Sequence, residues 1–136
     1  MNIQIPYGEI EDYVERKYRQ SVKLTYVNDN TFCVSRDMKV LFATKTVSIN
    51  LSVIQVEGSD VTLSYQAGLG IELLVKGALA WFKEQMTGVV EESANNSNQL
   101  IVHLAEIQQL KKTFSVIYAQ GVVFTQGDIK IQLFLR

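Results

Sequence analysis

The chain contains very little proline, cysteine or histidine. Pro6, Cys33 and His103 are the only residues of their kinds among 136. A single proline excludes a proline-rich linker between two domains, and the length is that of one domain, which we expect to span residues 1–136. One cysteine cannot form an internal disulfide, and one histidine cannot by itself supply a histidine-based metal site.

The chain also lacks an excess of charge of either sign. Thirteen Lys and Arg residues and 14 Asp and Glu residues give a net charge of -1. Because nucleic-acid binding needs a basic surface well in excess of its acidic neighbours, we expect no nucleic-acid partner. The same near-neutrality argues against adhesion to an anionic membrane surface.

No apolar segment has the length of a membrane span. The most apolar one, Ile71–Met86, is too short and carries Glu72, Lys76 and Lys83, so no transmembrane segment is expected. The first six residues lack a cationic stretch followed by an apolar one, so no secretory signal is predicted. Together with the lone Cys33, this favours a soluble protein in the cytoplasm.

Alternating apolar and polar residues predict antiparallel strands joined in hairpins. Turn-forming residues lie at 28–30, 58–60 and 126–128. Before the second of these turns, apolar residues alternate from Val47 to Val53, and the alternation changes phase at Ile54, which predicts a β-bulge there. The polar segment Glu91–Asn98 is predicted to be the most mobile loop.

Two helices are predicted. A short amphipathic helix is expected over residues 7–19, and a long apolar helix over Ile71–Met86. The polar residues of the long helix form one narrow stripe, so most of its circumference should be covered. We therefore predict an α+β fold, in which a strongly twisted antiparallel sheet of about seven strands packs around the long helix.

The reactive residues are interpreted as structural. His103 lies on a half-buried strand without a nearby motif, and Cys33 lies between Phe32 and Val34 in a strand, the setting of an inert thiol. The glycines at 68 and 70 lack the remainder of a nucleotide-binding fingerprint. We therefore predict no catalytic residue, no cofactor and no enzymatic activity.

An acidic group near the N-terminus could in principle hold a hard cation. Its members are Glu9, Glu11, Asp12 and Glu15. Glu11, Glu15 and Arg19 follow one another in steps of four along a predicted helix, which is typical of solvated ion pairing. No metal site is therefore predicted.

The order of the predicted elements resembles a known family. The apolar helix Ile71–Met86 and the closing pattern from Leu100 to Leu104, through Ile107 and Leu110 to the hairpin over residues 122–131, carry the likeness. In this pattern of apolarity the chain is similar to the tubular lipid-binding modules related to bactericidal/permeability-increasing protein. The resemblance implies a curved antiparallel sheet wrapped around a long helix, with acyl chains held between them.

Our leading functional hypothesis is non-catalytic binding of an apolar or lipid-like ligand between the long helix and the curved sheet. The groove is predicted to be lined by Leu74, Ala78, Trp81 and Phe82. The alternative is a protein-interaction or assembly domain whose helix only fills a packed core, with a partner that the sequence does not identify. An enzyme with dispersed catalytic groups is the third hypothesis.

Overall fold

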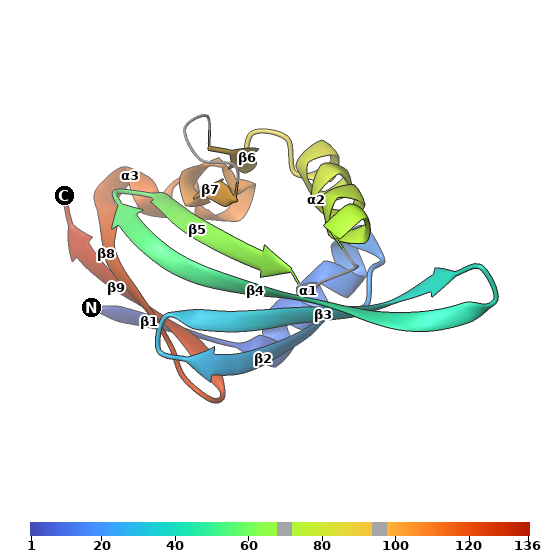
Figure 1. Ribbon diagram of the computed structural model, residues 1–136. Helices are drawn as coiled ribbons and strands as arrows, with labels where there is room; N and C mark the ends of the chain where they lie inside the picture. The colour runs from blue at the N-terminus through green and yellow to red at the C-terminus, as the bar shows by residue number, and fades with distance from the viewer. Residues whose placement is uncertain (68–71, 94–97) are drawn as a thin grey trace.

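The structure is a computed structural model that describes residues 1–67, 72–93 and 98–136. Within these ranges, the side chains at positions 40, 67, 72–75, 78, 81 and 82 lie outside the description. The described residues are mostly β, and their strands pair antiparallel in two sheets (Figure 1).

The smaller sheet joins the two ends of the chain. Its three strands have the order β1-β9-β8, in which β1 is Asn2–Pro6, β8 is Ile117–Phe124 and β9 is Asp128–Leu135. The larger sheet has six strands in the order β2-β3-β4-β5-β7-β6. Their bounds are Lys23–Asn28 for β2, Thr31–Val40 for β3, Ala43–Glu57 for β4, Asp60–Ala67 for β5, Val90–Glu92 for β6 and Gln99–His103 for β7.

Turns of the larger sheet lie against β8, an edge strand of the smaller one. The Ala119 N–H donates to the Gly58 carbonyl at 2.6 Å, and the Phe124 N–H donates to the Asp29 carbonyl at 2.8 Å. Gly58 lies in the β4–β5 turn, where its φ of 69° suits glycine, and Asp29 lies in the β2–β3 turn. These bonds satisfy backbone groups of a strand that would otherwise offer an open edge.

The helices are short. They are α1 (Tyr7–Tyr18), α2 (Glu72–Gln85) and α3 (Thr113–Val116), with single 3-10 turns η1 (Leu104–Glu106) and η2 (Gln108–Leu110). Helix α1 agrees with the predicted N-terminal helix. No helix in the described ranges is long and apolar enough to cross a membrane.

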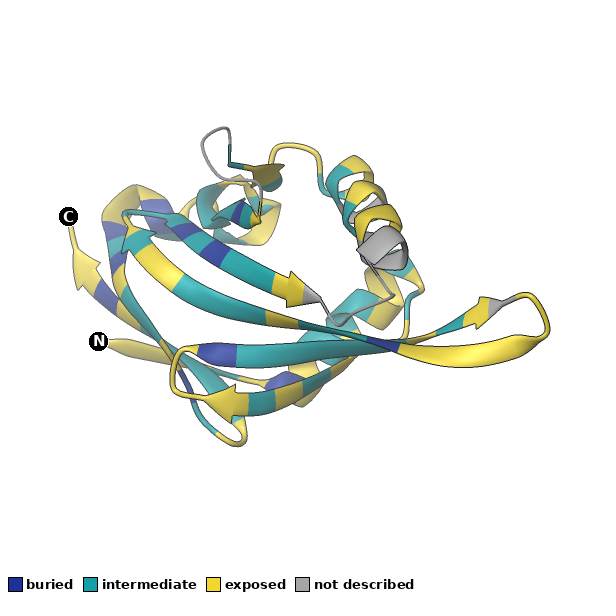
Figure 2. Cartoon of the chain, viewed as in Figure 1, coloured by how far each residue is buried: buried dark blue, intermediate teal, exposed yellow. Residues whose placement is uncertain are grey.

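The predicted α+β fold is wrong in its central feature. The described residues contain no long apolar helix packed against the sheet, and they form two sheets in place of one sheet of about seven strands. Helix α2 lies to one side of β4 and β5, and Lys76, Gly77 and Ala80 on it are exposed (Figures 1 and 2). A salt bridge of 3.2 Å between Lys83 and Glu92 ties this helix to β6.

The error has a physical cause. An apolar helix must be covered by something, but its composition does not say which surface covers it. The strands also have apolar faces, and the two sheets satisfy this requirement by facing each other. The ring centroids of Phe32 on β3 and Phe124 on β8 lie 4.8 Å apart, in an edge-on contact between the two sheets.

The hairpin predictions are confirmed at all three turns. The predicted bulge is also confirmed, because the β4–β5 register shifts between Val53 and Gln55 and leaves Ile54 as the extra residue, half exposed. Strand β1 was not predicted. It pairs with β9, and neither its composition nor its neighbours in sequence signal that partner.

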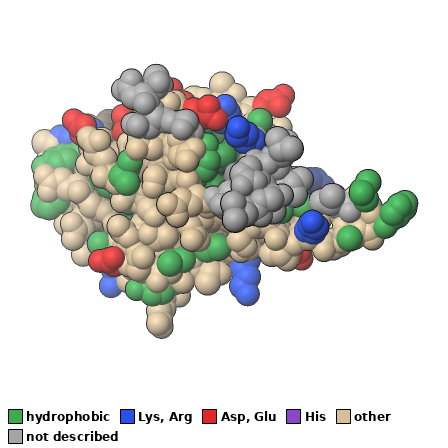
Figure 3. Space-filling view, viewed as in Figure 1, with side chains coloured by type: hydrophobic (Ala, Val, Ile, Leu, Met, Phe, Trp, Pro, Cys, Tyr) green, Lys and Arg blue, Asp and Glu red, His purple; other side chains and the backbone are tan. Residues whose placement is uncertain are grey.

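Strands β3 and β4 continue beyond the body of the protein as a two-stranded arm. The described pairing of β3 with β2 ends at Ser35, and that of β4 with β5 begins at Ile49. Between these points β3 and β4 pair with each other as far as Val40 and Ala43. Figure 1 shows the arm projecting to one side, and Figure 3 shows hydrophobic side chains at its end.

One cluster of buried side chains lies where α3 meets the smaller sheet. It consists of Phe114, Ile117, Ala119 and Leu133. The interior faces of the larger sheet are buried or half-buried, as Figure 2 shows along β4 and β5. Further buried apolar residues, Val61, Leu63, Leu100 and Phe124, lie along both sheets.

Candidate functional site

A cavity of about 700 Å³ lies between the two sheets, and apolar side chains form most of its lining. The lining comes from strands of both sheets, from helix α1 and from the 3-10 turns that follow β7. It is therefore a property of the whole tertiary structure and belongs to no single motif.

The smaller sheet contributes two cross-strand rows of side chains. The rows are Ile3, Ile131 and Val122, and Ile5, Ile129 and Phe124. Residues directly opposite one another on neighbouring strands face the same side of a sheet. Each row is therefore a continuous strip of β-branched and aromatic surface that faces the cavity.

The larger sheet provides the facing wall. Val53 pairs with Leu63 across β4 and β5, and Val61 pairs with Val102 across β5 and β7. Phe32 on β3 extends this wall toward its contact with Phe124 on the smaller sheet. The alternation that the sequence displays supplies this wall, since every second residue of a strand points to one face.

Several lining residues remain in contact with solvent. Val53, Val102, Leu104, Ile107 and Leu110 are only half-buried, although all of them face the space between the sheets. In a close-packed core, such aliphatic side chains would touch neighbours on every side. Leu104 and Leu110 pack on one side against the buried cluster around Phe114, so these side chains line the cavity between packed and solvent-exposed surface.

Helix α1 brings the charged groups of the lining. Glu9, Asp12 and Arg16 line the cavity beside the apolar Ile10 and Val14 of the same helix. An amphipathic helix at the edge of an apolar cavity places polar groups where they can orient a ligand.

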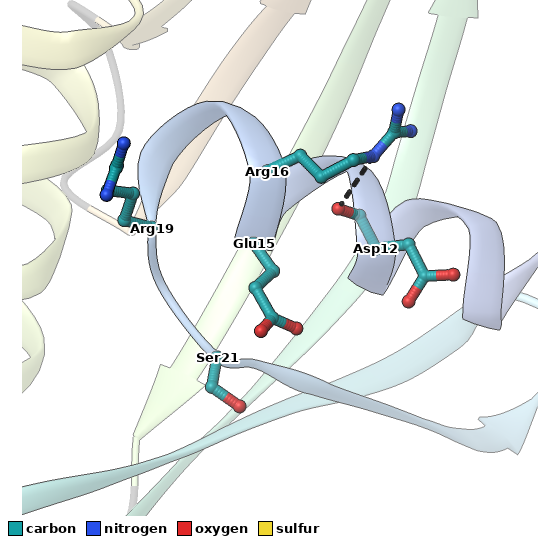
Figure 4. Close-up of a pocket in the computed structure, with 5 residues that line it drawn as sticks. All are labelled: Asp12, Glu15, Arg16, Arg19 and Ser21. Carbon is teal, nitrogen blue, oxygen red and sulfur yellow. Dashed lines mark hydrogen bonds between the residues drawn. The ribbon is translucent and has the colours of Figure 1, made fainter.

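Asp12 and Arg16 also border a second, open hollow at the end of α1, together with Glu15, Arg19 and Ser21 (Figure 4). All five residues are exposed, and the Arg16 and Arg19 side chains point away from each other. The Arg16 Nε donates to the backbone carbonyl of Asp12 at 3.4 Å. These side chains do not converge on one point, so they do not form a binding site for a single ligand.

The four side chains predicted to line a ligand groove, those of Leu74, Ala78, Trp81 and Phe82, lie outside the described residues. Their role stays a prediction. Met86, which follows helix α2, does line the cavity. Sequence reasoning missed the lining from β1, β9 and the 3-10 turns, because its members come together only through strand pairing.

His103 is held between two carboxylates. Its Nδ1 lies 2.7 Å from Asp60 Oδ1, and its Nε2 lies 3.0 Å from Glu91 Oε1. The hydrogen bond to Asp60, followed by that to Glu91, raises the pKa of His103 above its ordinary value, against the opposing effect of burial. As an imidazolium, the ring donates to both carboxylates and links β5, β6 and β7.

The remaining candidates have local structural contacts. The Sγ atom of Cys33 lies 3.7 Å from Ser35 Oγ on the same strand. Glu11 differs from the prediction of solvated ion pairing, because its Oε2 accepts the backbone N–H of Leu24 at 2.7 Å and ties α1 to β2. The glycines at 68 and 70 and residues 94–97 of the predicted mobile loop lie outside the described residues.

The described part of the chain contains no group of three or more His, Cys, Asp and Glu side chains placed to hold a metal ion. What the arrangement offers chemically is an apolar surface around a cavity that is partly open to solvent, with a few charges on one side. No family model, curated protein or solved structure matches the chain.

Proposed function

We propose that the protein is a non-catalytic binder of an apolar ligand, such as a fatty acid or a phospholipid tail. The ligand occupies the cavity between the two sheets, with α1 beside it. The observation that carries the proposal is the volume of about 700 Å³ with a largely apolar lining. This volume lies within the range of about 300–1,000 Å³ typical of small-molecule sites.

The hydration of the lining supports the same conclusion. The lining is only half-buried in places, so water can reach part of it and apolar area there stays hydrated. An apolar ligand that covers this area stabilises the folded state.

An acyl chain fits the shape of the lining. The two rows on the smaller sheet run across its strands, and the facing wall of the larger sheet offers a second apolar surface. Each buried methylene contributes about 0.8 kcal/mol, so a long chain gains more than a compact ligand of the same polarity. Of the three charged lining residues, Glu9, Asp12 and Arg16, the cation Arg16 is the one that would attract a carboxylate or phosphate end group.

Two further parts of the proposal rest on the sequence. Membership of the family related to bactericidal/permeability-increasing protein stays a prediction. The described residues do not contain the sheet wrapped around a long helix that this resemblance implies. A cytoplasmic location depends on the lone Cys33, which suits a reducing compartment.

The proposal is tested on the purified protein. Organic extraction followed by mass spectrometry is expected to release an acyl-containing molecule in near-stoichiometric amount. After delipidation, palmitate should raise the melting temperature and displace a fluorescent fatty-acid probe. At a hundredfold excess over its dissociation constant, palmitate should add about 2.7 kcal/mol to the free energy of unfolding.

Hexanoate serves as the matched control, because it has the same head group and a chain too short to gain much from burial. Finding no extracted lipid, together with no thermal response to palmitate, would contradict the proposal. That result would favour the alternative of a protein-interaction or assembly domain.

A further inference from the structure

Two apolar side chains at the end of the β3–β4 arm have no cover. Leu41 is 94% exposed and Phe42 is 107% exposed, more than any other large hydrophobic residue in the described part of the chain. They occupy the turn between the two strands, where Leu41 has a φ of 57°. The arm therefore exposes apolar side chains at its tip.

The arm also keeps this surface away from the body of the protein. From Arg36 and Val47 outward, the described pairing of β3 and β4 is only with each other. The stretch from Arg36 to Val40 spans about 17 Å in extended conformation. Figures 1 and 3 show the arm reaching beyond both sheets.

Cations surround the apolar tip on both faces of the ribbon. Lys39 pairs with Thr44, and Lys45 pairs with Met38 in the adjacent position, so the two lysines lie on opposite faces at similar distances from the tip. Both are exposed. The arm's one carboxylate, Asp37, accepts a hydrogen bond from Thr46 Oγ1 at 2.7 Å.

We propose that the tip of the arm inserts into the head-group boundary of an anionic lipid membrane. Leu41 and Phe42 enter the apolar region. Lys39 and Lys45, which lie level with each other behind the tip, contact the lipid phosphates. The near-neutral net charge of the chain does not oppose this contact, because charges more than a Debye length of about 8 Å away are screened.

A membrane fits this surface better than a protein partner does. Stable protein interfaces bury about 800 Å² on each side and need complementary shape, whereas two side chains at a convex tip offer far less area. A lipid surface needs no matching pocket, and it accepts cations on both faces of an inserted ribbon. The proposal stands on the arm alone and does not depend on a ligand in the cavity.

The test is cosedimentation of the purified protein with vesicles of phosphatidylcholine containing about 30% phosphatidylserine, compared with phosphatidylcholine alone. Binding is expected with the anionic vesicles. The double variant Leu41→Asn with Phe42→Thr should bind at least about tenfold more weakly than the wild type. Asparagine is chosen because it tolerates the positive φ at position 41. Replacing Lys39 and Lys45 by Gln should weaken binding about 30-fold.

Matched controls come from exposed residues elsewhere. Val116→Thr changes another exposed apolar side chain, and Lys111→Gln with Lys112→Gln removes two cations away from the arm; both should bind as the wild type does. The proposal is overturned if the wild type ignores anionic vesicles, or if the tip variant binds them unchanged. It is also overturned if light scattering shows a wild-type oligomer that the tip variant dissolves, since the tip then contacts a second copy.

Discussion

At the scale of single residues, His103 shows how strand pairing gives a role to a side chain that lacks any motif. Asp60 is its direct partner across the β5–β7 ladder, and Glu91 comes from β6 on the other side of β7. The carboxylates are 43 and 12 residues away from His103 in sequence, so no local sequence pattern predicts that they contact it. The ring acts as a link between three strands.

This link should make stability depend on pH. Because the pKa of His103 is raised in the folded state, its contribution is fully present below the ordinary value of about 6.5 and is lost as pH rises through the folded-state pKa. We expect His103→Gln to be less stable than the wild type at pH 5.5, with the difference shrinking at mildly alkaline pH. Urea unfolding at a series of pH values measures this difference.

Asp60→Asn and Glu91→Gln are the controls for the histidine. Each removes one carboxylate, so each should reduce part of the pH dependence, and Asp60→Asn should reduce more of it. If the difference between wild type and His103→Gln is the same across the whole pH series, His103 does not titrate in this range and the link is not ionic.

At the scale of the element, the bulge in β4 decides which side chains face the cavity. Val53 faces the cavity, and Ile54, the extra residue of the bulge, is half exposed. We expect Val53→Phe to lower the affinity for a fluorescent fatty acid severalfold while costing less than the ~1–3 kcal/mol of an overpacked core. Probe titration and urea unfolding measure these two quantities.

Ile54→Phe is the matched control, because it makes a similar substitution at the neighbouring position. It should leave the probe affinity unchanged. The opposite result would be a Val53→Phe protein that is destabilised as strongly as an overpacked core and still binds the probe like the wild type. That result would show that no ligand space lies beside Val53.

Strand β4 could be predicted from the sequence because its apolar residues alternate with polar ones over many positions. Strand β1 could not be, since it is short, ends in Pro6 and pairs only with a strand from the other end of the chain. The β3–β4 arm was missed for a different reason. Positions 41–46 are exposed, so apolar and polar residues need not alternate there and the sequence shows no strand pattern.

At the scale of the whole molecule, the contact between the two sheets holds the cavity in place. Phe32 and Phe124 meet edge-on, and aromatic pairs of this kind are coupled by about 0.5–1.5 kcal/mol beyond the area that they bury. We expect a double-mutant cycle with Phe32→Leu and Phe124→Leu to give a coupling free energy in this range. Urea unfolding of the four proteins measures it.

The pair Tyr118 and Phe134 serves as a comparison, because its stacked rings lie 5.8 Å apart within the smaller sheet alone. Both cycles should give coupling, but only loss of the first contact should also reduce palmitate binding, since it joins the two walls. Zero coupling between Phe32 and Phe124 would mean that the sheets do not meet there.

The sequence by itself determined the local features: the antiparallel hairpins and their turns, the bulge at Ile54 and the helix near the N-terminus. These follow from side-chain alternation and turn chemistry between residues that are close along the chain. Only the tertiary structure decided that strands from the two ends form a separate sheet, that this sheet faces the larger one, and that a hollow remains between them. Alternation shows which side chains point inward, whereas the surface that meets them depends on contacts between distant segments.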